Sequence, residues 1–237
     1  MERQQGSLES IVETLLNGRK RLEVLDAGCG AASHFSHRSD SHLVGIDISR
    51  EQLEKNTALH ERILGDVQEY PLHQGQYDII TCWDVLEHLS KPKLALNNFA
   101  QAIKNGGLIV LASPNVLSLR GLLTKFTPHW IHVWYYRFVV GLKDAGKPGR
   151  YPFESYHRFA MSPPAIKKFA RKHNLAVEFF RYNSWDHPEY KYRLFMIAWR
   201  ATNKVVHTLS FGAIGTDEFQ GFQIILRKAP GDRSNRD

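Results

Sequence analysis

The stretch LEVLDAGCG, residues 22–30, is a short apolar run that ends in an aspartate and a glycine turn. The apolar residues before Asp26 favour a buried β-strand that ends there. Gly28 and Gly30 permit a sharp turn and let the backbone approach a ligand closely, because no side chain intervenes. Ligands of open parallel sheets bind beyond the carboxyl ends of the strands, so this stretch predicts one wall of a binding site.

Further short apolar runs follow within the first half of the chain, and polar residues close most of them. The runs cover 43–46, 63–64, 77–82 and 108–112, and the closing residues are Asp47, Asp66 and the triplet Cys82, Trp83 and Asp84. Helical stretches lie between the runs, such as the one expected over 91–104. This alternation predicts right-handed βαβ crossovers and an α/β fold with a doubly wound, mainly parallel sheet.

The pattern changes after residue 114. Residues 115–160 are rich in aromatic residues and interrupted by prolines, and we expect them to be irregular. The elements predicted beyond them are a helix capped by Ser162, a strand near 176–182, a helix over 190–209 and a strand over 219–227. The expected organisation is one domain over 1–237, with substrate-side cap segments inserted at 115–160 and 183–218.

The composition is that of a globular protein. The 237 residues are 43% hydrophobic and 23% charged, which excludes disordered and collagen-like chains. With Cys29 and Cys82 as the only cysteines, we expect no disulfide framework, no zinc site and a reducing, cytoplasmic location. No apolar run is long enough for a transmembrane helix, and the first ten residues lack the apolar core of a secretion signal.

Charge is distributed unevenly along the chain. Residues 1–118 carry 11 Lys and Arg against 15 Asp and Glu, whereas residues 119–237 carry 20 against 9. The basic second half suits an anionic partner such as a phosphate-bearing substrate, a membrane surface or a nucleic acid. A solvated basic face explains the same excess equally well.

The acidic residues at the strand ends indicate the kind of ligand. Asp47 lies nineteen residues after Gly28, the spacing of a carboxylate that accepts both hydroxyls of a ribose. A dinucleotide site would have a third glycine where Ser33 stands, and it would bring a pyrophosphate close to Asp26. A carboxylate suits a cationic ammonium or sulfonium group better, so S-adenosylmethionine is the predicted cofactor.

Four motifs, in matching order and spacing, resemble those of class I S-adenosylmethionine-dependent methyltransferases. They are VLDAGCG at 24–30, VGIDIS at 44–49, GDVQEYPL at 65–72, and YDIITCWDVLEHL at 77–89 followed by NGGLIVLASPN at 105–115. The stretch TCWDVLEHL is most similar to the ubiquinone-biosynthesis O-methyltransferases. The resemblance implies a seven-stranded Rossmann-like methyltransferase sheet, here with an inserted aromatic-rich cap.

The resemblance also implies roles for the residues around the cofactor. Gly28 and Gly30 would line the methionine moiety beside Asp26, and Asp47 would hold the ribose, with Ile48 next to it. A purely structural explanation is a tight glycine turn, with Asp47 capping the helix that follows it.

The adenine end and the reactive end of the cofactor are expected to contact later motifs. Asp66 and Val67 would meet the adenine, and Trp83 would border the cofactor together with Cys82, a small residue in the same strand. Asp66 follows a strand, so capping of a turn explains it equally well.

The candidate general bases are histidines. Transfer of a methyl group to a phenol or a similar hydroxyl group benefits from a base. The candidates are His88, His129, His132 and His157. Of these, we select two as catalytic predictions: His88, near the cofactor, and His157, which opens the stretch HRFAMSPP, similar to the substrate side of related enzymes. Capping or packing is the alternative role for both.

Asp84, Glu87 and His88 share one face if this segment is helical. A related cluster is associated with a divalent metal in the ubiquinone-biosynthesis family, but Asp84 stands where that family usually has Glu. We therefore predict no metal site, and the alternative role of Glu87 and His88 is to stabilise the loop.

Ten aromatic residues between 126 and 159 indicate a lid or substrate wall. An apolar or aromatic acceptor would pack there, although a satellite core under a long connection explains any single aromatic. With Lys125, Arg137 and Lys143 nearby, the same residues suit a lipid interface and hence peripheral membrane contact.

These observations favour methyl transfer to a small aromatic or prenylated molecule, preferably at oxygen. One alternative is an RNA methyltransferase that uses the basic second half. Another is a partner subunit that binds the cofactor without catalysis. No known nucleic-acid-binding module is present, and DNA is not an expected partner.

Overall fold

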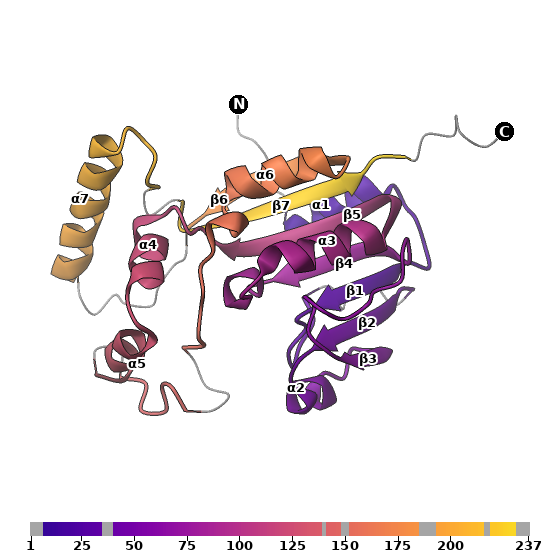
Figure 1. Ribbon diagram of the computed structural model, residues 1–237, viewed down its shortest axis with the longest axis horizontal. Coiled ribbons are helices and arrows are strands. Elements are labelled where there is room, and N and C mark those ends of the chain that lie inside the picture. Colours follow the sequence, from indigo (N-terminus) through magenta and orange to yellow (C-terminus); the bar gives the residue numbers. More distant parts are fainter. Residues whose placement is uncertain are drawn as a thin grey trace.

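The computed structural model describes residues 7–34, 40–138, 141–147, 152–184, 193–215 and 219–230. Its centre is a seven-stranded sheet in the order β3-β2-β1-β4-β5-β7-β6 (Figure 1). The strands are β1 (Glu23–Ala27), β2 (His42–Asp47), β3 (Glu61–Leu64), β4 (Tyr77–Trp83), β5 (Ile103–Pro114), β6 (Leu175–Asn183) and β7 (Gly221–Lys228).

The sheet is mainly parallel, as the sequence predicts. Strands β3, β2, β1, β4 and β5 pair in parallel, and β7 runs antiparallel to both β5 and β6. The order reverses between β1 and β4, which makes their carboxyl ends the topological switch point where ligands of such sheets bind. The predicted doubly wound, seven-stranded fold is confirmed.

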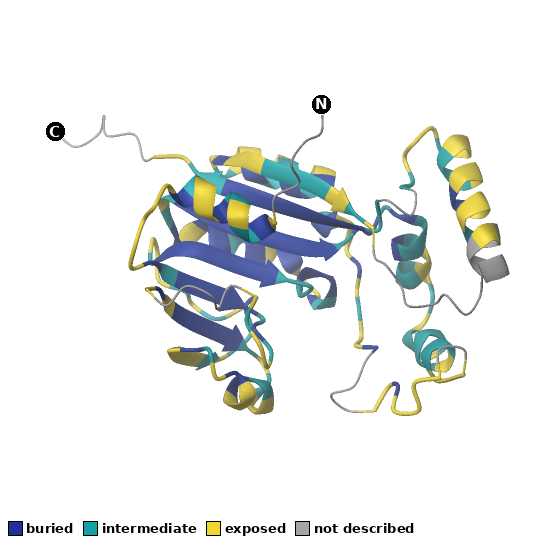
Figure 2. Cartoon of the chain, turned by 180° about the vertical axis from the view of Figure 1, so that it is seen from behind, coloured by how far each residue is buried: buried dark blue, intermediate teal, exposed yellow. Residues whose placement is uncertain are grey.

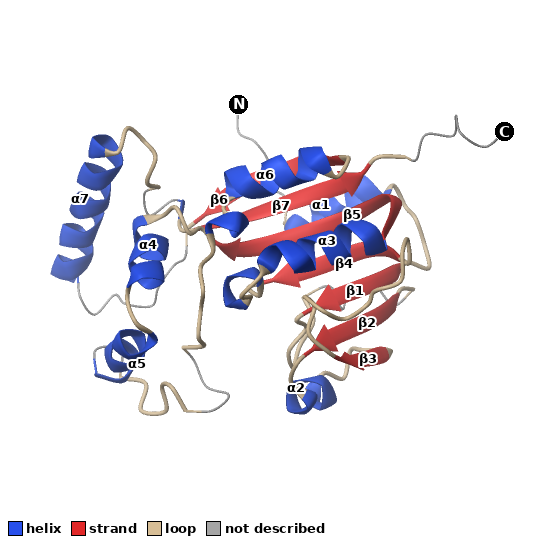
Figure 3. Ribbon diagram, in the orientation of Figure 1, coloured by secondary structure: helices blue, strands red, loops and turns tan. Residues whose placement is uncertain are grey.

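Helices cover both faces of the sheet (Figure 3). The helices of the described residues are α1 (Leu8–Leu16), α2 (Arg50–Lys55), α3 (Pro92–Ala102), α4 (Leu119–Phe126), α5 (His129–Phe138), α6 (Pro163–Lys172) and α7 (Arg193–Leu209), with the 3-10 turns η1 (Leu86–His88) and η2 (Phe159–Met161). Of these, α1, α2, α3 and α6 pack on the sheet.

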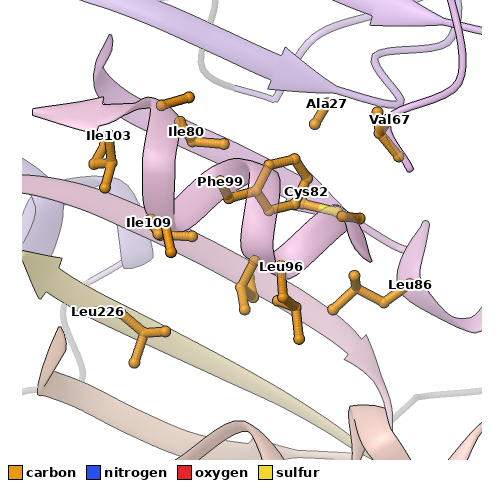
Figure 4. Close-up of a cluster of buried hydrophobic side chains, with 14 of the residues drawn as sticks. Ala27, Val67, Ile80, Cys82, Leu86, Leu96, Phe99, Ile103, Ile109 and Leu226 are labelled. Carbon is orange, nitrogen blue, oxygen red and sulfur yellow. The ribbon is translucent and has the colours of Figure 1, made fainter. Parts of the chain in front are cut away.

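Two apolar clusters attach these helices to the sheet. On one face, Leu96 and Phe99 of α3 and Ile166 of α6 pack with the strands, as Figure 4 shows for the α3 side. On the other face, Leu8, Val12 and Leu16 of α1 and Leu53 of α2 pack against a second set of strand residues. Both faces of the central strands are therefore buried, which explains their continuous apolar runs.

The fifth strand is longer than the sequence suggested. It begins at Ile103, where the helix before it ends, rather than at residue 108. Tyr77 pairs with Ile103 and Ile79 with Leu108, so a bulge absorbs the residues between them. Gly106, with φ of +75°, supplies the left-handed backbone conformation in this bulge.

The expectation that residues 115–160 are irregular was wrong for part of the segment. Two helices, α4 and α5, lie within it, beyond the carboxyl ends of β4 and β5 (Figure 1). The Ser118 hydroxyl accepts the N–H of Gly121 at 3.0 Å and caps α4. Pro128 precedes α5 and accepts the N–H of Ile131 at 3.0 Å, so this proline starts a helix instead of breaking one.

Helices α4, α5 and α7 form a lobe that is set off from the sheet, with α4 and α5 mostly half-buried and the described part of α7 mostly exposed (Figure 2). The predicted helix over 190–209 corresponds to α7. Among the described residues, no helix is both long and apolar enough to cross a bilayer.

Candidate functional site

Asp26, at the end of β1, has a carboxylate oxygen that lacks a partner. Its side chain is buried, and the Thr81 hydroxyl donates to Oδ1 at 2.8 Å. Oδ2 has no hydrogen-bond partner among the described residues. Burial raises the pKa of Asp26, and the Thr81 hydrogen bond opposes this shift. A cationic group beside Oδ2 would satisfy the oxygen and favour the ionised carboxylate, which fits the ammonium or sulfonium group of S-adenosylmethionine.

The glycine turn after β1 is held against β2 and cannot carry a larger residue at its first position. Gly28 donates to the Ile46 carbonyl at 2.8 Å and has φ of +76°. A Cβ at Gly28 would lie 2.3 Å from Cγ2 of Val85. Gly30 also has positive φ, at +53°, but a Cβ there would meet no atom within 4 Å of the described structure. The open space at Gly30 is where a ligand can approach the backbone.

Asp47, at the end of β2, is fixed by two backbone donors. The Gly30 N–H donates to Oδ2 at 3.0 Å, and the Ser49 N–H donates to Oδ1 at 2.8 Å. Each carboxylate oxygen retains a lone pair, so both can still accept a ribose hydroxyl. The Ser49 hydroxyl accepts from Gln52 and caps α2, so Asp47 is not the helix cap. Ile48 is exposed beside it, an apolar side chain available to a flat ligand.

Three of the predicted cofactor residues have side chains engaged elsewhere. Asp66 accepts the Gln68 N–H at 2.8 Å and its side-chain amide at 2.9 Å, the arrangement of a capped turn. Val67 and Cys82 are buried in the apolar cluster between the sheet and α3 (Figure 4). Contacts from these three positions to a cofactor therefore remain predictions.

Trp83 lies at the end of β4, where it contacts the segment that follows the glycine turn and lines a polar cleft. Its ring stacks on His34, with centroids 4.6 Å apart and planes inclined by 19°. Trp83 also lines the cleft described below. His34 could not be predicted from the sequence, because the segment that brings it onto Trp83 carries no recognisable pattern.

The cleft has a volume of about 350 Å³ and opens at the carboxyl ends of β4, β5 and β6. Its lining residues are Trp83, Asp84, Ala112, Ser113, Asn183, Ser184, Phe222 and Gln223. Several are polar, and Oδ1 of Asn183 is buried without a hydrogen-bond partner among the described residues. Ser113, Asn183 and Gln223 are not among the site residues predicted from the sequence. The rule that sites form at strand ends could have found Ser113, whereas Asn183 and Gln223 come from distant parts of the chain.

Asp84 is the ionisable residue of this cleft. It is half-buried, with left-handed backbone at φ of +52°, and burial raises its pKa to about 6. It does not share a helical face with Glu87 and His88, because only the three residues of η1 are helical. The helical arrangement considered for these three side chains is therefore wrong.

Glu87 lies beneath the cleft and is nearly fully buried. The Ser113 hydroxyl donates to Oε2 at 3.1 Å. Burial, followed by repulsion from Asp84, raises the pKa of Glu87 to about 8. The carboxyl group is therefore mostly protonated at neutral pH. Within the described ranges, no three His, Cys, Asp or Glu side chains are grouped as a metal site requires.

The backbone of residues 154–157, here called the strap, is attached to η1. The Tyr156 N–H donates to the Glu87 carbonyl at 2.7 Å, and the Glu154 carbonyl lies 2.6 Å from Nδ1 of His88. A carbonyl only accepts, so Nδ1 carries the proton, and Nε2, which lies 3.9 Å from Oε1 of Glu87, is the unprotonated nitrogen of the neutral ring. Burial lowers the pKa of His88. His88 thus fastens the strap to the end of η1.

His157, the other predicted base, lies in the strap but does not line the cleft. It is buried with φ of +42°, and Nδ1 has no partner among the described residues. Burial, followed by the neighbouring His88, His132 and Lys125, lowers its pKa to about 4. Its imidazole is neutral at physiological pH and can accept a proton only weakly.

A family profile described as a methyltransferase domain matches residues 1–178. The ubiquinone biosynthesis O-methyltransferase of Erwinia tasmaniensis is 29% identical over 143 residues, which are 56% of this chain and 59% of that protein. The Escherichia coli enzyme of the same name is 34% identical over 103 residues, 39% of this chain and 43% of that protein. The matched region spans about half the length of these curated relatives.

Solved structures share the fold at low identity. The YcgJ protein of Bacillus subtilis has a TM-score of 0.57 at 17% identity, over 94% of this chain and 99% of that one. An S-adenosylmethionine-dependent methyltransferase from Mesorhizobium loti has a TM-score of 0.57 at 14% identity, over 94% of this chain and 99% of that one.

Proposed function

The chain belongs to the class I S-adenosylmethionine-dependent methyltransferases, and we propose that it methylates an oxygen of a small aromatic or prenylated acceptor. The observation that carries this proposal is the position of Trp83. Its ring stacks on His34, four residues after the glycine turn that fits the cofactor, and it lines the polar cleft that contains Asp84. The two sites adjoin at the switch point of the sheet, where methyl donor and acceptor have to meet.

The residues at the ends of β1 and β2 fit the cofactor chemically. Oδ2 of Asp26 suits the cationic methionine end, the space at Gly30 admits it, and Asp47 suits the ribose hydroxyls. S-adenosylmethionine supplies an activated methyl group on sulfur, so the protein has only to align an acceptor and exclude water.

On the acceptor side, the proposal assigns the role of proton acceptor to Asp84. Its carboxylate lines the cleft, and its raised pKa of about 6 leaves it ionised yet basic at neutral pH. A hydroxyl group in the cleft would donate to Asp84 as its oxygen attacks the methyl group. Oδ1 of Asn183 offers a second acceptor for the same substrate. His88 and His157 stay alternative bases, to be separated from Asp84 by mutation.

The acceptor class is supported by two features. Relatives that match this chain are named ubiquinone biosynthesis O-methyltransferases. The lobe beyond the cleft exposes aromatic side chains, including Trp130 and Phe126, that suit an apolar substrate. For a prenylated acceptor the protein would act peripherally at a membrane.

Titration calorimetry with S-adenosylhomocysteine, with NAD as the competing ligand, tests the cofactor assignment. We expect micromolar binding of S-adenosylhomocysteine and none of NAD. Methyl transfer is then measured on soluble phenols, prenylated phenols and RNA.

The acceptor panel also separates the two alternative functions. Turnover on RNA alone, with an affinity that falls steeply with salt, would support the RNA methyltransferase. Cofactor binding with no turnover on any acceptor would support the non-catalytic subunit.

A further inference from the structure

We propose that an apolar face on α4 and α5 docks the catalytic end of the protein on an anionic lipid surface. This face, called the docking face below, consists of Leu123, Phe126, Trp130, Trp134 and Phe138. The inference rests on the proposed function for its purpose, delivery of a lipid-borne acceptor, but the binding itself is measured without methyl transfer.

Three aromatic residues of α5 form a stripe along one side of the helix. Trp130, Trp134 and Phe138 follow one another at intervals of four residues, which places them on the same side of a helix. Their exposed fractions are 68%, 54% and 69%. The rings of Trp134 and Phe138 contact each other, with centroids 6.0 Å apart. The stripe is thus a ready-made apolar surface.

Packing within the protein covers only one side of this helix, where side chains such as Val133 and Tyr136 are half-buried. None of the ten residues of α5 is buried, although most of them are apolar or aromatic. A helix this short is only marginally stable in water unless its apolar side packs against something. Phe126 and Leu123, at the end of α4, are exposed as well. A partner that covers the docking face would supply the missing burial.

Charge around the docking face indicates the kind of partner. Residues 119–147 contain five Lys and Arg against one acidic residue, Asp144, which pairs with Lys147. Helix α7, in the same lobe, has three basic residues and no acidic one. Basic residues flanking exposed Trp and Phe are typical of helices that lie in the interface of an anionic membrane.

Two other partners fit the docking face less well. A second copy of the chain would bring two basic lobes together and incur repulsion. RNA requires cations interleaved with stacking aromatics, whereas the only Lys or Arg of α5 is Arg137, and its guanidinium donates to the Ala145 carbonyl at 2.7 Å.

The lobe lies at the same end of the sheet as the cleft, so docking would affect access to the cleft. Helices α4 and α5 lie beyond the carboxyl ends of β4 and β5, the end at which the cleft opens (Figure 1). Lys125 of α4 donates to the His157 carbonyl at 3.2 Å, which ties the lobe to the strap. Contact of the docking face with a membrane would bring the cleft near acceptors that reside in the lipid.

Vesicle flotation of the full chain tests the proposal. The vesicles contain either phosphatidylcholine alone or about one third phosphatidylglycerol, and no methyl donor is present. We expect wild type to float with the anionic vesicles, and the double variant Trp130→Ala/Trp134→Ala to partition at least about tenfold less. The matched control is Leu94→Ala/Val177→Ala, which removes exposed apolar side chains from α3 and β6 and should float like wild type. Thermal unfolding and S-adenosylhomocysteine titration show that each variant is folded.

The proposal is overturned if wild type does not float, or if the folded Trp variant floats as well as wild type. Self-association or RNA binding that depends on the two Trp residues, without flotation, would also overturn it. Methyl transfer to a water-soluble phenol is measured separately. Flotation without any methyl transfer counts against the proposed function alone, and methyl transfer without flotation counts against the docking face alone.

Discussion

The backbone N–H of Gly30 donates to Oδ2 of Asp47 at 3.0 Å. This hydrogen bond joins the glycine turn after β1 to the acidic end of β2, seventeen residues apart in the chain. The two predicted contacts to the cofactor are therefore one unit. A ligand whose ribose binds the Asp47 carboxylate is therefore coupled to the glycine turn, which is expected to contact the methionine end of the same ligand.

The Asp47 carboxylate is expected to be essential for cofactor binding. Replacing Asp47 by Ala removes the acceptor for the ribose hydroxyls and releases the Gly30 N–H. We expect the Kd for S-adenosylhomocysteine, measured by calorimetry, to rise by about tenfold to a hundredfold. The control Glu54→Ala changes an exposed carboxylate on neighbouring α2 and should leave the Kd unchanged. An unchanged Kd in folded Asp47→Ala would remove Asp47 from the site.

Gly28 and Gly30 should respond differently to alanine. At Gly28 the positive φ and the 2.3 Å approach to Val85 predict a loss of about 2–4 kcal/mol in the free energy of unfolding. At Gly30 only backbone strain applies, about 1 kcal/mol, and the new methyl group would occupy the space expected to hold the cofactor. Gly30→Ala should therefore remain folded and lose S-adenosylhomocysteine binding.

Val85, the residue that a side chain at Gly28 would meet, supplies a control for the Gly28→Ala variant. Val85→Ala removes the two methyl groups nearest the Gly28 position. Denaturant unfolding of the single and double variants should give a coupling energy of about 1–2 kcal/mol, because the clash disappears in the double variant. Strictly additive effects would show that steric contact with Val85 is not what excludes a side chain.

Burial of Glu87 should make stability depend on pH. Its pKa is about 8 in the folded protein against 4.5 for an ordinary glutamate, so the folded state retains a proton that the unfolded state loses. The stabilisation by this proton is complete below pH 4.5 and is lost as pH rises to about 8. Over that range, Glu87→Gln should gain stability relative to wild type by on the order of a few kcal/mol.

Chemical denaturation at several pH values measures this difference. Asp84→Asn serves as the control for the smaller shift of the neighbouring carboxylate, whose pKa is about 6. If the difference in the free energy of unfolding between wild type and Glu87→Gln stays constant from pH 5 to pH 8, Glu87 ionises normally in the folded protein.

His88 should act by holding the strap rather than by accepting a proton. His88→Ala leaves the Glu154 carbonyl without its donor, so we expect faster hydrogen exchange at residues 154–157 and a higher KM for the acceptor. His88→Asn is the discriminating variant, because its amide can replace the Nδ1 donor but cannot serve as a base. Recovery of KM by Asn supports positioning. A kcat that falls about a hundredfold in both variants, with unchanged exchange, would identify His88 as the base.

Local patterns predicted the parts of this structure that depend on neighbouring residues. The strand before Asp26, the turn at Gly28 and the acidic end of β2 all follow from short runs of sequence. Helix α4 was missed because the prolines around it were interpreted as a sign of irregular structure, although its Ser118 cap is a local signal.

The acceptor side depends on contacts between distant segments, which no local pattern contains. Asn183 reaches the cleft a hundred residues after Trp83. His157 has the chemistry of a base, but it does not line the cleft, and its left-handed backbone angle is not indicated by its sequence neighbours. Selecting bases by residue type therefore favoured histidines over Asp84, whose altered pKa arises only from burial in the folded chain.

Asp84 is the expected general base. Only its ionised form can accept a proton, so kcat/KM should rise with pH through a pKa near 6. Asp84→Asn preserves the shape of the side chain but cannot ionise, so kcat/KM should fall by about a hundredfold or more and this rising limb should disappear. Because His157 has a pKa of about 4, a His157 base would place the limb two pH units lower. Initial rates on a phenolic acceptor, for wild type, Asp84→Asn and His157→Ala between pH 4 and pH 9, separate the two. Full activity in Asp84→Asn together with inactivity in His157→Ala would transfer the role to the histidine, and would require the strap to open so that His157 can reach the cleft.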